Sequence, residues 1–223
     1  AAVIEMGMNH PGEIAYLSEL AQPTVALVNN AQRAHLQGMG TVEEVAQEKG
    51  AIYQGLGAAG VAVVNVDDAH AEAWRALNAG RPIVTFGIDH EADVCGRCTL
   101  RGLGSRLELD TPQGKVDFAL QVPGLHNVRN ALGAAAACLA AGASREAVAE
   151  GLAGFTGTRG RLQRRAGPKG ALILDDSYNA NPDSVRAGID VLAAMPGHTW
   201  LVLGDMGEVG EISAQVHDEI GGY

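Results

Sequence analysis

A short stretch near the start of the chain, "EMGMNHPGEI", places several chemically active side chains directly after the apolar run "AAVI". It holds the carboxylates Glu5 and Glu13, the amide Asn9 and the imidazole His10 around a Pro-Gly turn. A carboxylate at the end of a buried strand suits Mg²⁺, which prefers oxygen ligands and is usually held by one or two protein groups together with phosphates. From position alone, Glu5 is equally well explained as a solvated loop residue, and both interpretations stay open.

A second candidate pair is His35, in the polar loop "NNAQRAHLQGMG", and Lys49, in the helix predicted to follow it. Thr41 with Glu44 three residues later is a capping-box pattern, so we expect that helix to span residues 42–56. A lone histidine is usually structural or on the surface, and a lysine in mid-helix usually lies on the solvated face. The residues alone therefore favour an ordinary role for both.

His126, Asn127 and Asn130 lie in "GLHNVRNALG", at the start of another predicted helix. The two amides are three residues apart and share one helix face. Amides at a helix N-terminus can recognise the edge of a nucleobase and complement a nearby phosphate. Simple helix capping by Asn127 competes with this interpretation.

The segment "LDDSYNANPDS" carries two adjacent carboxylates, a serine, a tyrosine and two asparagines after an apolar strand. This density exceeds that of an ordinary turn. An aspartate such as Asp176 at the end of a strand suits a ribose hydroxyl, as in other doubly wound sheets. Arg161, just upstream, can meet phosphate oxygens.

The order of the strand and helix patterns that carry these residues predicts an α/β fold. We expect a mostly parallel, doubly wound sheet with polar strand ends. Strand and helix patterns alternate over the first half, with strands expected at 1–7, 23–30, 60–68 and 81–88 and helices at 12–22, 42–56 and 69–80. Two-residue alternation between 92 and 123, with a Thr-Pro-Gln-Gly turn, predicts a small antiparallel hairpin region. Beyond it we expect helices at 127–143, 145–155 and 183–195, the first ended by Gly142 and the second capped by Ser144, and strands starting at 170 and 198.

Composition excludes several classes of protein. The chain has 223 residues and a formal net charge of −10, which argues against a nucleic-acid-binding surface and a basic membrane-binding patch. No apolar run approaches the roughly 18 residues of a membrane span, and the first residues lack the basic start of a signal peptide. Three cysteines do not make a disulfide framework, so a cytoplasmic location is expected. Cys95 and Cys98 form a CxxC without further zinc ligands, and we interpret them as incidental.

Taken together, these segments resemble the Mur ligases, ATP-dependent amide-forming enzymes of peptidoglycan synthesis. Within that family the pattern is most similar to the ligases that add D-alanyl-D-alanine to UDP-N-acetylmuramoyl-tripeptide. The similarity covers almost the whole chain and includes "EKG", "GRLQ" and "LGDMGEVG" in the family's order. Its most specific part is the combination of "ExGxNHxGEI" with "DDSYNANPxS".

The resemblance implies ATP and Mg²⁺ as cofactors, the two substrates just named, and no nucleic acid, membrane insertion or obligate protein partner. It implies that Mg²⁺ and catalysis depend on Glu5, His35 and Lys49, with Lys49 carbamylated into a carboxylate-like group. The resemblance also implies six residues that contact the nucleotide. Adenine would lie at His126, Asn127 and Asn130, the ribose at Asp176 with Asn181 nearby, and the phosphates at Arg161. The residues placed near the metal and the incoming substrate are Asn9, His10 and Glu13.

One departure from the family pattern is the lack of a "GxxxxGK[ST]" phosphate loop, which in the family lies upstream of the first matching segment, after an amino-terminal domain for the UDP-sugar. At the other end, "HTWLVLGDMGEVG" is similar to the start of the family's third, Rossmann-like domain, and Pro196-Gly197 is the candidate boundary. We therefore expect a central ATP-binding domain at 1–197 and the start of a C-terminal domain at 198–223.

We also expect this chain alone to be inactive in ligation. ATP-dependent phosphate release by residues 1–223 in the presence of both substrates would contradict that expectation. Two other interpretations stay open: a non-catalytic nucleotide-binding or interaction module derived from a Mur ligase, and another Mur-type amino acid ligase.

Overall fold

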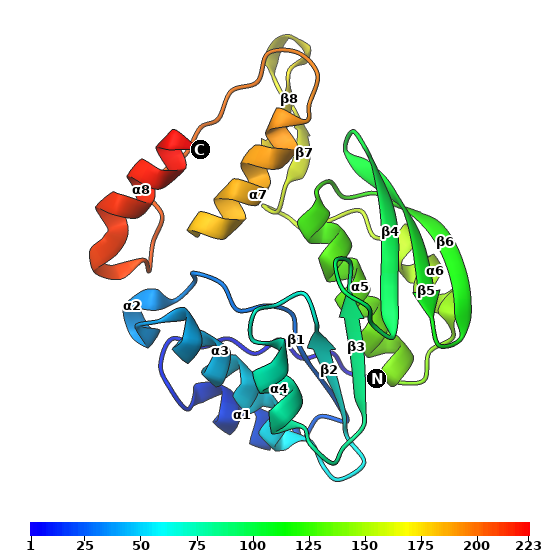
Figure 1. The fold of residues 1–223 in the computed structure, drawn as a ribbon. Coiled ribbons are helices and arrows are strands. Elements are labelled where there is room, and N and C mark those ends of the chain that lie inside the picture. Colours follow the sequence, from blue (N-terminus) through cyan, green and yellow to red (C-terminus); the bar gives the residue numbers. More distant parts are fainter.

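The computed structural model describes all 223 residues and contains a six-stranded sheet of order β1-β2-β3-β4-β5-β6 (Figure 1). The pairs β1–β2, β2–β3 and β3–β4 are parallel, whereas β4–β5, β5–β6 and the separate pair β7–β8 are antiparallel. The strands are β1 (Val25–Val28), β2 (Val61–Asn65), β3 (Ile83–Gly87), β4 (Val94–Arg101), β5 (Gly104–Thr111), β6 (Gly114–Leu120), β7 (Gln163–Ala166) and β8 (Leu172–Asp175). The predicted α/β fold with a mostly parallel sheet is confirmed.

The predicted helices form in the predicted order, and α2 adds a short helix within the stretch 29–40 that was expected to be a polar loop. They are α1 (Glu13–Ala21), α2 (Leu36–Met39), α3 (Val42–Gly50), α4 (Ala71–Leu77), α5 (Leu125–Ala140), α6 (Arg145–Ala153), α7 (Pro182–Ala193) and α8 (Ser213–Gly222), with short 3₁₀ helices η1 (Ala51–Gly55), η2 (Pro168–Gly170) and η3 (Gly210–Ile212). The helix expected at 42–56 is α-helical only as far as Gly50 and then continues as η1. None of these helices combines the length and hydropathy that a bilayer crossing demands.

The parallel strands are buried on both faces, which explains their nearly continuous apolar sequences. In β2, Ala62 and Val64 belong to a core shared with α1, α3 and α4, while Val63 between them belongs to a second core shared with α5 and α6. Figure 1 shows α1, α3 and α4 grouped on one side of β1–β3 and α5 on the other. This arrangement is the doubly wound sheet that the sequence predicts.

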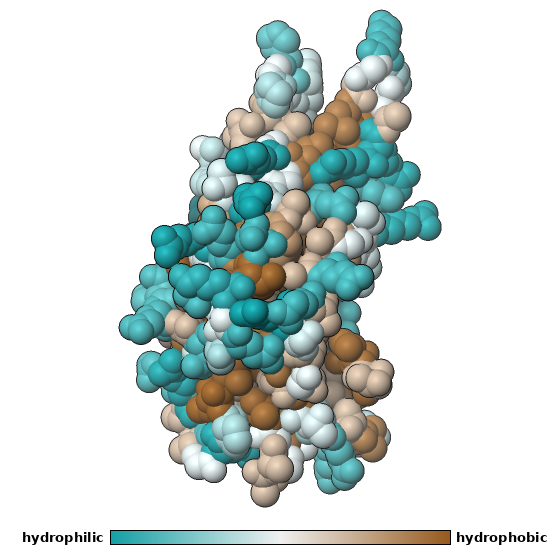
Figure 2. All heavy atoms as spheres, turned by 90° about the vertical axis from the view of Figure 1, so that its right-hand side faces the viewer, coloured by the Kyte–Doolittle hydropathy of each residue, from teal (hydrophilic) through white to brown (hydrophobic).

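The predicted hairpin region is larger than expected and belongs to the main sheet. It forms a three-stranded meander, β4–β6, that joins the parallel strands through pairing of Val94 with Phe86. In β5, Leu107 and Leu109 are buried while Arg106 and Glu108 are exposed, as expected for a sheet with one solvated face. Seen from the side of this meander, the surface is mostly hydrophilic (Figure 2).

A smaller unit is formed by β7, β8, α7 and α8 (Figure 1, yellow to red). Its own apolar cluster joins Val185 of α7 to Val216 and Ile220 of α8 and to Met206 and Val209 of the preceding segment. This packing joins α7 to α8. Both helices contact the loop that follows β1 through Arg33.

Two predicted strands are wrong. Residues 1–8 form no strand, and Val3 and Ile4 are 100% and 59% exposed; residues 198–207 form none either, and Trp200 and Val202 are 86% and 93% exposed. An apolar run becomes a strand only where a neighbouring strand accepts its backbone hydrogen bonds. Neither segment pairs with any strand of the two sheets.

The predicted helix caps are confirmed. Thr41 and Glu44 form a reciprocal capping box at α3, and Ser144 accepts from the Ala147 N–H at α6. Asn181, expected near the ribose, caps α7: its Oδ1 accepts from the Ser184 N–H at 2.9 Å, and Ser184 Oγ accepts from the Asn181 N–H at 3.0 Å.

Two replacements of Asn181 test its role as the cap of α7. We expect Asn181→Ala to lower the free energy of unfolding by about 1 kcal/mol and Asn181→Ser, which retains a cap, to lower it much less. Urea denaturation of both variants checks this. Equal stability of the alanine and serine variants would contradict the capping role.

Candidate active site

The carboxyl ends of β1 and β2 carry a chain of hydrogen bonds that reaches the start of α5. Asn29 Nδ2 donates to Asn130 Oδ1 at 2.7 Å, and Asn65 Nδ2 donates to the Asn29 carbonyl at 2.8 Å. Asn130 Nδ2 lies 3.5 Å from Asn127 Oδ1, which confirms that the predicted amide pair shares one helix face. Gly133 allows this close approach, because an added Cβ would lie 3.1 Å from Asn29 Oδ1.

Lys49 extends from α3 toward the same edge of the sheet and is not a solvated surface residue. Its Nζ donates to the Asn30 carbonyl at 2.8 Å. Burial lowers the pKa of Lys49, and the negative charge of Asp68 raises it in part. A lowered pKa leaves more of the amine neutral, which is the form that reacts with CO₂. Asp68 also accepts from the Ala31 N–H at 2.8 Å and so ties the loops after β1 and β2 together.

The stretch 9–14 is tied to α3 through Glu48, the neighbour of Lys49. Glu48 is 7% exposed, and its two carboxylate oxygens accept from the Gly12 N–H at 2.9 Å and the Ile14 N–H at 2.8 Å. Gly12 gives α1 no side-chain cap, so Glu48 satisfies the first N–H groups of that helix from another element. A negative charge at a helix N-terminus is also favourable.

We expect Glu48→Gln to lower the free energy of unfolding by about 1–3 kcal/mol, because a glutamine oxygen accepts one of the two buried N–H groups and its amide faces the other. Thermal or urea unfolding measures the loss. Glu43→Gln, the same charge change at an exposed position of α3, is the matched control and should be nearly neutral. A Glu48→Gln variant as stable as this control would contradict the assignment.

The other predicted residues of this stretch form a local cluster. Glu13 Oε2 accepts from the N–H groups of Asn9 at 2.6 Å and His10 at 3.0 Å, and His10 Nδ1 lies 3.4 Å from Glu13 Oε1. The backbone hydrogen bonds from Asn9 and His10 lower the pKa of Glu13. Glu13 therefore orders the turn, while Asn9 and His10 keep exposed side chains.

His35 faces a carboxylate of the smaller unit. Its Nδ1 lies 2.8 Å from Oε2 of Glu208, although without hydrogen-bond geometry. Both residues adopt a left-handed backbone conformation with φ of 59°. Such conformations are costly for residues other than glycine and persist only where the surroundings impose them.

The three predicted metal ligands lie in different surroundings. Glu5 is exposed and makes no hydrogen bond or ion pair, and no group of three or more His, Cys, Asp or Glu side chains could hold a metal ion. Carboxylate oxygens from Glu5 and a carbamylated Lys49 would suit Mg²⁺ in type.

The predicted nucleotide side lies between α5 and β8. Burial lowers the pKa of His126, and the charge of Asp176 opposes that shift, so the two groups lie within electrostatic range. Asp176 Oδ1 accepts from the Leu162 N–H at 3.0 Å. The guanidinium of the exposed Arg161 lies 4.3 Å from the centre of the Tyr178 ring.

Capping by Asn127, the competing interpretation, is wrong. The N-cap of α5 is Gly124, and Asn127 Nδ2 donates to the Pro123 carbonyl at 2.7 Å. Its amide orientation is thereby fixed, while Asn130 links it to β1.

Several residues of the site went unrecognised in the sequence. Asn29 follows β1, Asn65 ends β2 and Asp68 lies three residues beyond it. Polar residues directly after apolar runs are a usable signal at the carboxyl edge of a parallel sheet. Glu48 and Arg33 carry no such signal, because their partners are distant along the chain. The partners of Glu48 lie 34 and 36 residues away, and those of Arg33 lie 150 and 186 residues away.

Comparison with known proteins identifies the family. The Mur ligase middle-domain model matches residues 1–138, and the model of the Mur ligase, glutamate ligase domain matches residues 160–223. The UDP-N-acetylmuramoyl-tripeptide–D-alanyl-D-alanine ligase of Escherichia coli is 41% identical over 99% of this chain and 49% of its own length. The chain thus spans about half the length of the relatives it matches.

Solved structures agree. MurF from Acinetobacter baumannii superposes with a TM-score of 0.94 at 38% identity, covering 99% of this chain and 48% of its own. MurF ligase from Thermotoga maritima in complex with ADP gives a TM-score of 0.86 at 27% identity, covering 98% of this chain and 50% of its own. A family model matches more than half of the chain, and the relatives resemble it in both sequence and structure. The chain therefore belongs to the Mur ligase family.

Proposed function

We propose that the protein carrying this chain joins D-alanyl-D-alanine to UDP-N-acetylmuramoyl-tripeptide at the expense of ATP, in peptidoglycan precursor synthesis. The observation that carries this proposal is the 41% identity, along 99% of the chain, to a ligase named for that reaction. The partly buried Lys49 amine and the amide pair at the start of α5 support the proposal, because both contact the segment that directly follows β1.

The reaction has two balanced steps. A carboxylate oxygen of the tripeptide attacks the γ-phosphorus of ATP, the bond from that phosphorus to the β,γ-bridging oxygen breaks, and ADP leaves with the electron pair. The neutral amine of D-alanyl-D-alanine then adds to the acyl carbon, and phosphate leaves as the amide forms and a proton is lost. The net products are the amide, ADP and phosphate.

This chain's part is to hold the reactants in line. We assign adenine to the amides of Asn127 and Asn130 with His126, the ribose to Asp176, and the phosphates to Arg161, whose exposed guanidinium has free donors. Asn9, His10 and Glu13 belong to the substrate side. A bound Mg²⁺ would neutralise charge on the phosphate oxygens; Glu5, His35 and carbamylated Lys49 are the residues that we assign to it.

The test is product analysis with the full-length protein. ADP and a new UDP-linked pentapeptide, seen by liquid chromatography with mass detection, should form only when ATP, tripeptide and dipeptide are all present. A preference for a single amino acid over D-alanyl-D-alanine would indicate another Mur-type ligase. Nucleotide binding without any product would indicate a non-catalytic module.

A further inference from the structure

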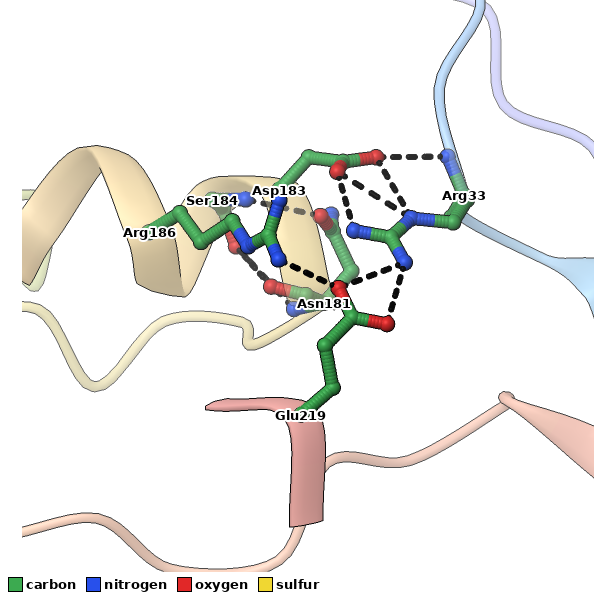
Figure 3. A network of polar contacts seen from close by, with 6 residues as sticks. All are labelled: Arg33, Asn181, Asp183, Ser184, Arg186 and Glu219. Carbon is green, nitrogen blue, oxygen red and sulfur yellow. Dashed lines mark hydrogen bonds and ion pairs between the residues drawn. The ribbon is translucent and has the colours of Figure 1, made fainter. Parts of the chain in front are cut away.

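The loop that follows β1, residues 29–35, is held at its far end by one arginine. Arg33 Nη2 donates to Asp183 Oδ1 at 2.7 Å, Nε lies 3.1 Å from the same oxygen, and Nη1 donates to both oxygens of Glu219 at 3.0 Å (Figure 3). The Arg33 N–H also donates to Asp183 Oδ2 at 3.0 Å. Figure 3 shows that the three residues come from the loop, the first turn of α7 and α8.

We propose that Arg33 is a positioning residue that fixes the distance between the two sides of the active site by clamping α7 and α8 onto the loop after β1. In its kinetic part this proposal rests on the function proposed above. None of Arg33, Asp183 and Glu219 is among the residues assigned above to a substrate, to the nucleotide or to Mg²⁺.

The clamp is stronger than an ordinary surface ion pair. The side chains of Arg33, Asp183 and Glu219 are 26%, 24% and 31% exposed, and the guanidinium meets one carboxylate in fork geometry while a second lies beside it. Exposed single pairs contribute little, whereas partly buried pairs with several charge-assisted hydrogen bonds contribute more. Hydrogen bonds from Arg33 lower the pKa of Asp183 against the opposing effect of its burial, so the carboxylate stays charged at neutral pH.

The loop connects this clamp to the metal side of the site. Its residue Asn30 accepts from Lys49 Nζ, and His35 follows Arg33 by two positions. The loop contains no helix or strand of its own. Its geometry therefore depends on its anchors, which are Lys49 and Asp68 near the sheet and Arg33 at the other end.

Asp183, the partner of Arg33 on α7, connects the clamp to the nucleotide side. Asp183 lies two residues after Asn181, the cap that ends the segment carrying Asp176. On α8, Glu219 also forms an ion pair with Arg186 of α7, with Nη2 2.7 Å from Oε1, so the two helices are held together. A shift of this body relative to the loop would change the separation of Asp176 from Lys49.

The test compares charge-reversal variants of the full-length protein. Arg33→Glu should raise amide hydrogen exchange in residues 29–35 several-fold and reduce kcat about 10-fold, the scale expected when remote contacts misplace reacting groups by a fraction of an ångström. The double variant Arg33→Glu/Asp183→Arg restores opposite charges at positions 33 and 183 but not toward Glu219, so it should recover part of both. Arg106→Glu, which breaks an ion pair with Asp117 on the solvated face of β5–β6, is the matched control and should change neither.

Each outcome decides the proposal. Unchanged exchange in Arg33→Glu overturns the clamp, whatever the activity. Raised exchange with unchanged kcat and KM overturns the positioning role, as does a double variant no better than Arg33→Glu alone. If the wild-type protein makes no pentapeptide, the proposed function fails, and hydrogen exchange alone then decides whether the clamp exists.

Discussion

Replacing Lys49 by alanine is expected to reduce ligation by about 10²–10³-fold, the loss typical of removing one preorganised electrostatic group from an active site. The reason is the setting of the amine: it is buried, its pKa is lowered, and its only hydrogen bond is to the Asn30 carbonyl. Such an amine can add to CO₂ and become a carbamate, which we propose as its working form. The measurement is the initial rate of ADP release by the full-length protein with both substrates.

A matched variant tells a carbamate from a cation. Lys49→Arg keeps the positive charge but cannot be carbamylated, so it should be as inactive as the alanine variant. Depletion of bicarbonate should slow the wild type and leave both variants unchanged. If Lys49→Arg retained most of the activity, Lys49 would act as a cation and the carbamate proposal would be wrong.

Replacing Trp74 by alanine is expected to lower the free energy of unfolding by about 3–5 kcal/mol, the range for removal of a large buried aromatic side chain. Trp74 is 1% exposed, and its Nε1 donates to the Ala46 carbonyl of α3 at 3.0 Å. It also sits against Gly50, where an added Cβ would lie 3.1 Å from its ring. Loss of the ring would therefore loosen α3, the helix that carries Glu48 and Lys49.

Urea unfolding followed by circular dichroism measures this loss. Trp74→Phe keeps most of the apolar volume and loses the indole hydrogen bond, so it should cost much less than the alanine variant. Glu72→Ala, at an exposed position of the same helix, controls for effects on α4 itself. An alanine variant within 1 kcal/mol of the wild type, by the same scale, would show that α3 is held by other contacts.

The sequence was sufficient to predict elements that depend on local signals. The caps at Thr41 and Ser144 and the end of α5 near Gly142, where φ is 90°, follow from residue types within a few positions. The alternation of Ala62, Val63 and Val64 between two cores follows from burial of a parallel strand on both faces. These features need no knowledge of distant residues.

The features that the sequence did not predict depend on residues that are distant along the chain. The apolar runs at 1–7 and 198–204 look like β1 and β2, but whether such a run is a strand depends on a partner edge that periodicity does not reveal. In the site, residue type pointed to Asp176 and the family resemblance pointed to Lys49, whereas the pairing of Asn29 with Asn130 joins residues 101 positions apart. The contacts of Arg33 with Asp183 and Glu219 were equally hidden, since each partner alone is an ordinary charged surface residue.

The contrast between the two tryptophans gives the chain built-in optical reporters. Trp74 is 1% exposed beside α3, and Trp200 is 86% exposed in the unpaired segment before α8. Their fluorescence should therefore divide into a short-wavelength component shielded from acrylamide and a long-wavelength component that acrylamide quenches readily. In Trp74→Phe only the second remains, so its emission directly reports any molecule or strand that comes to cover residues 200–203.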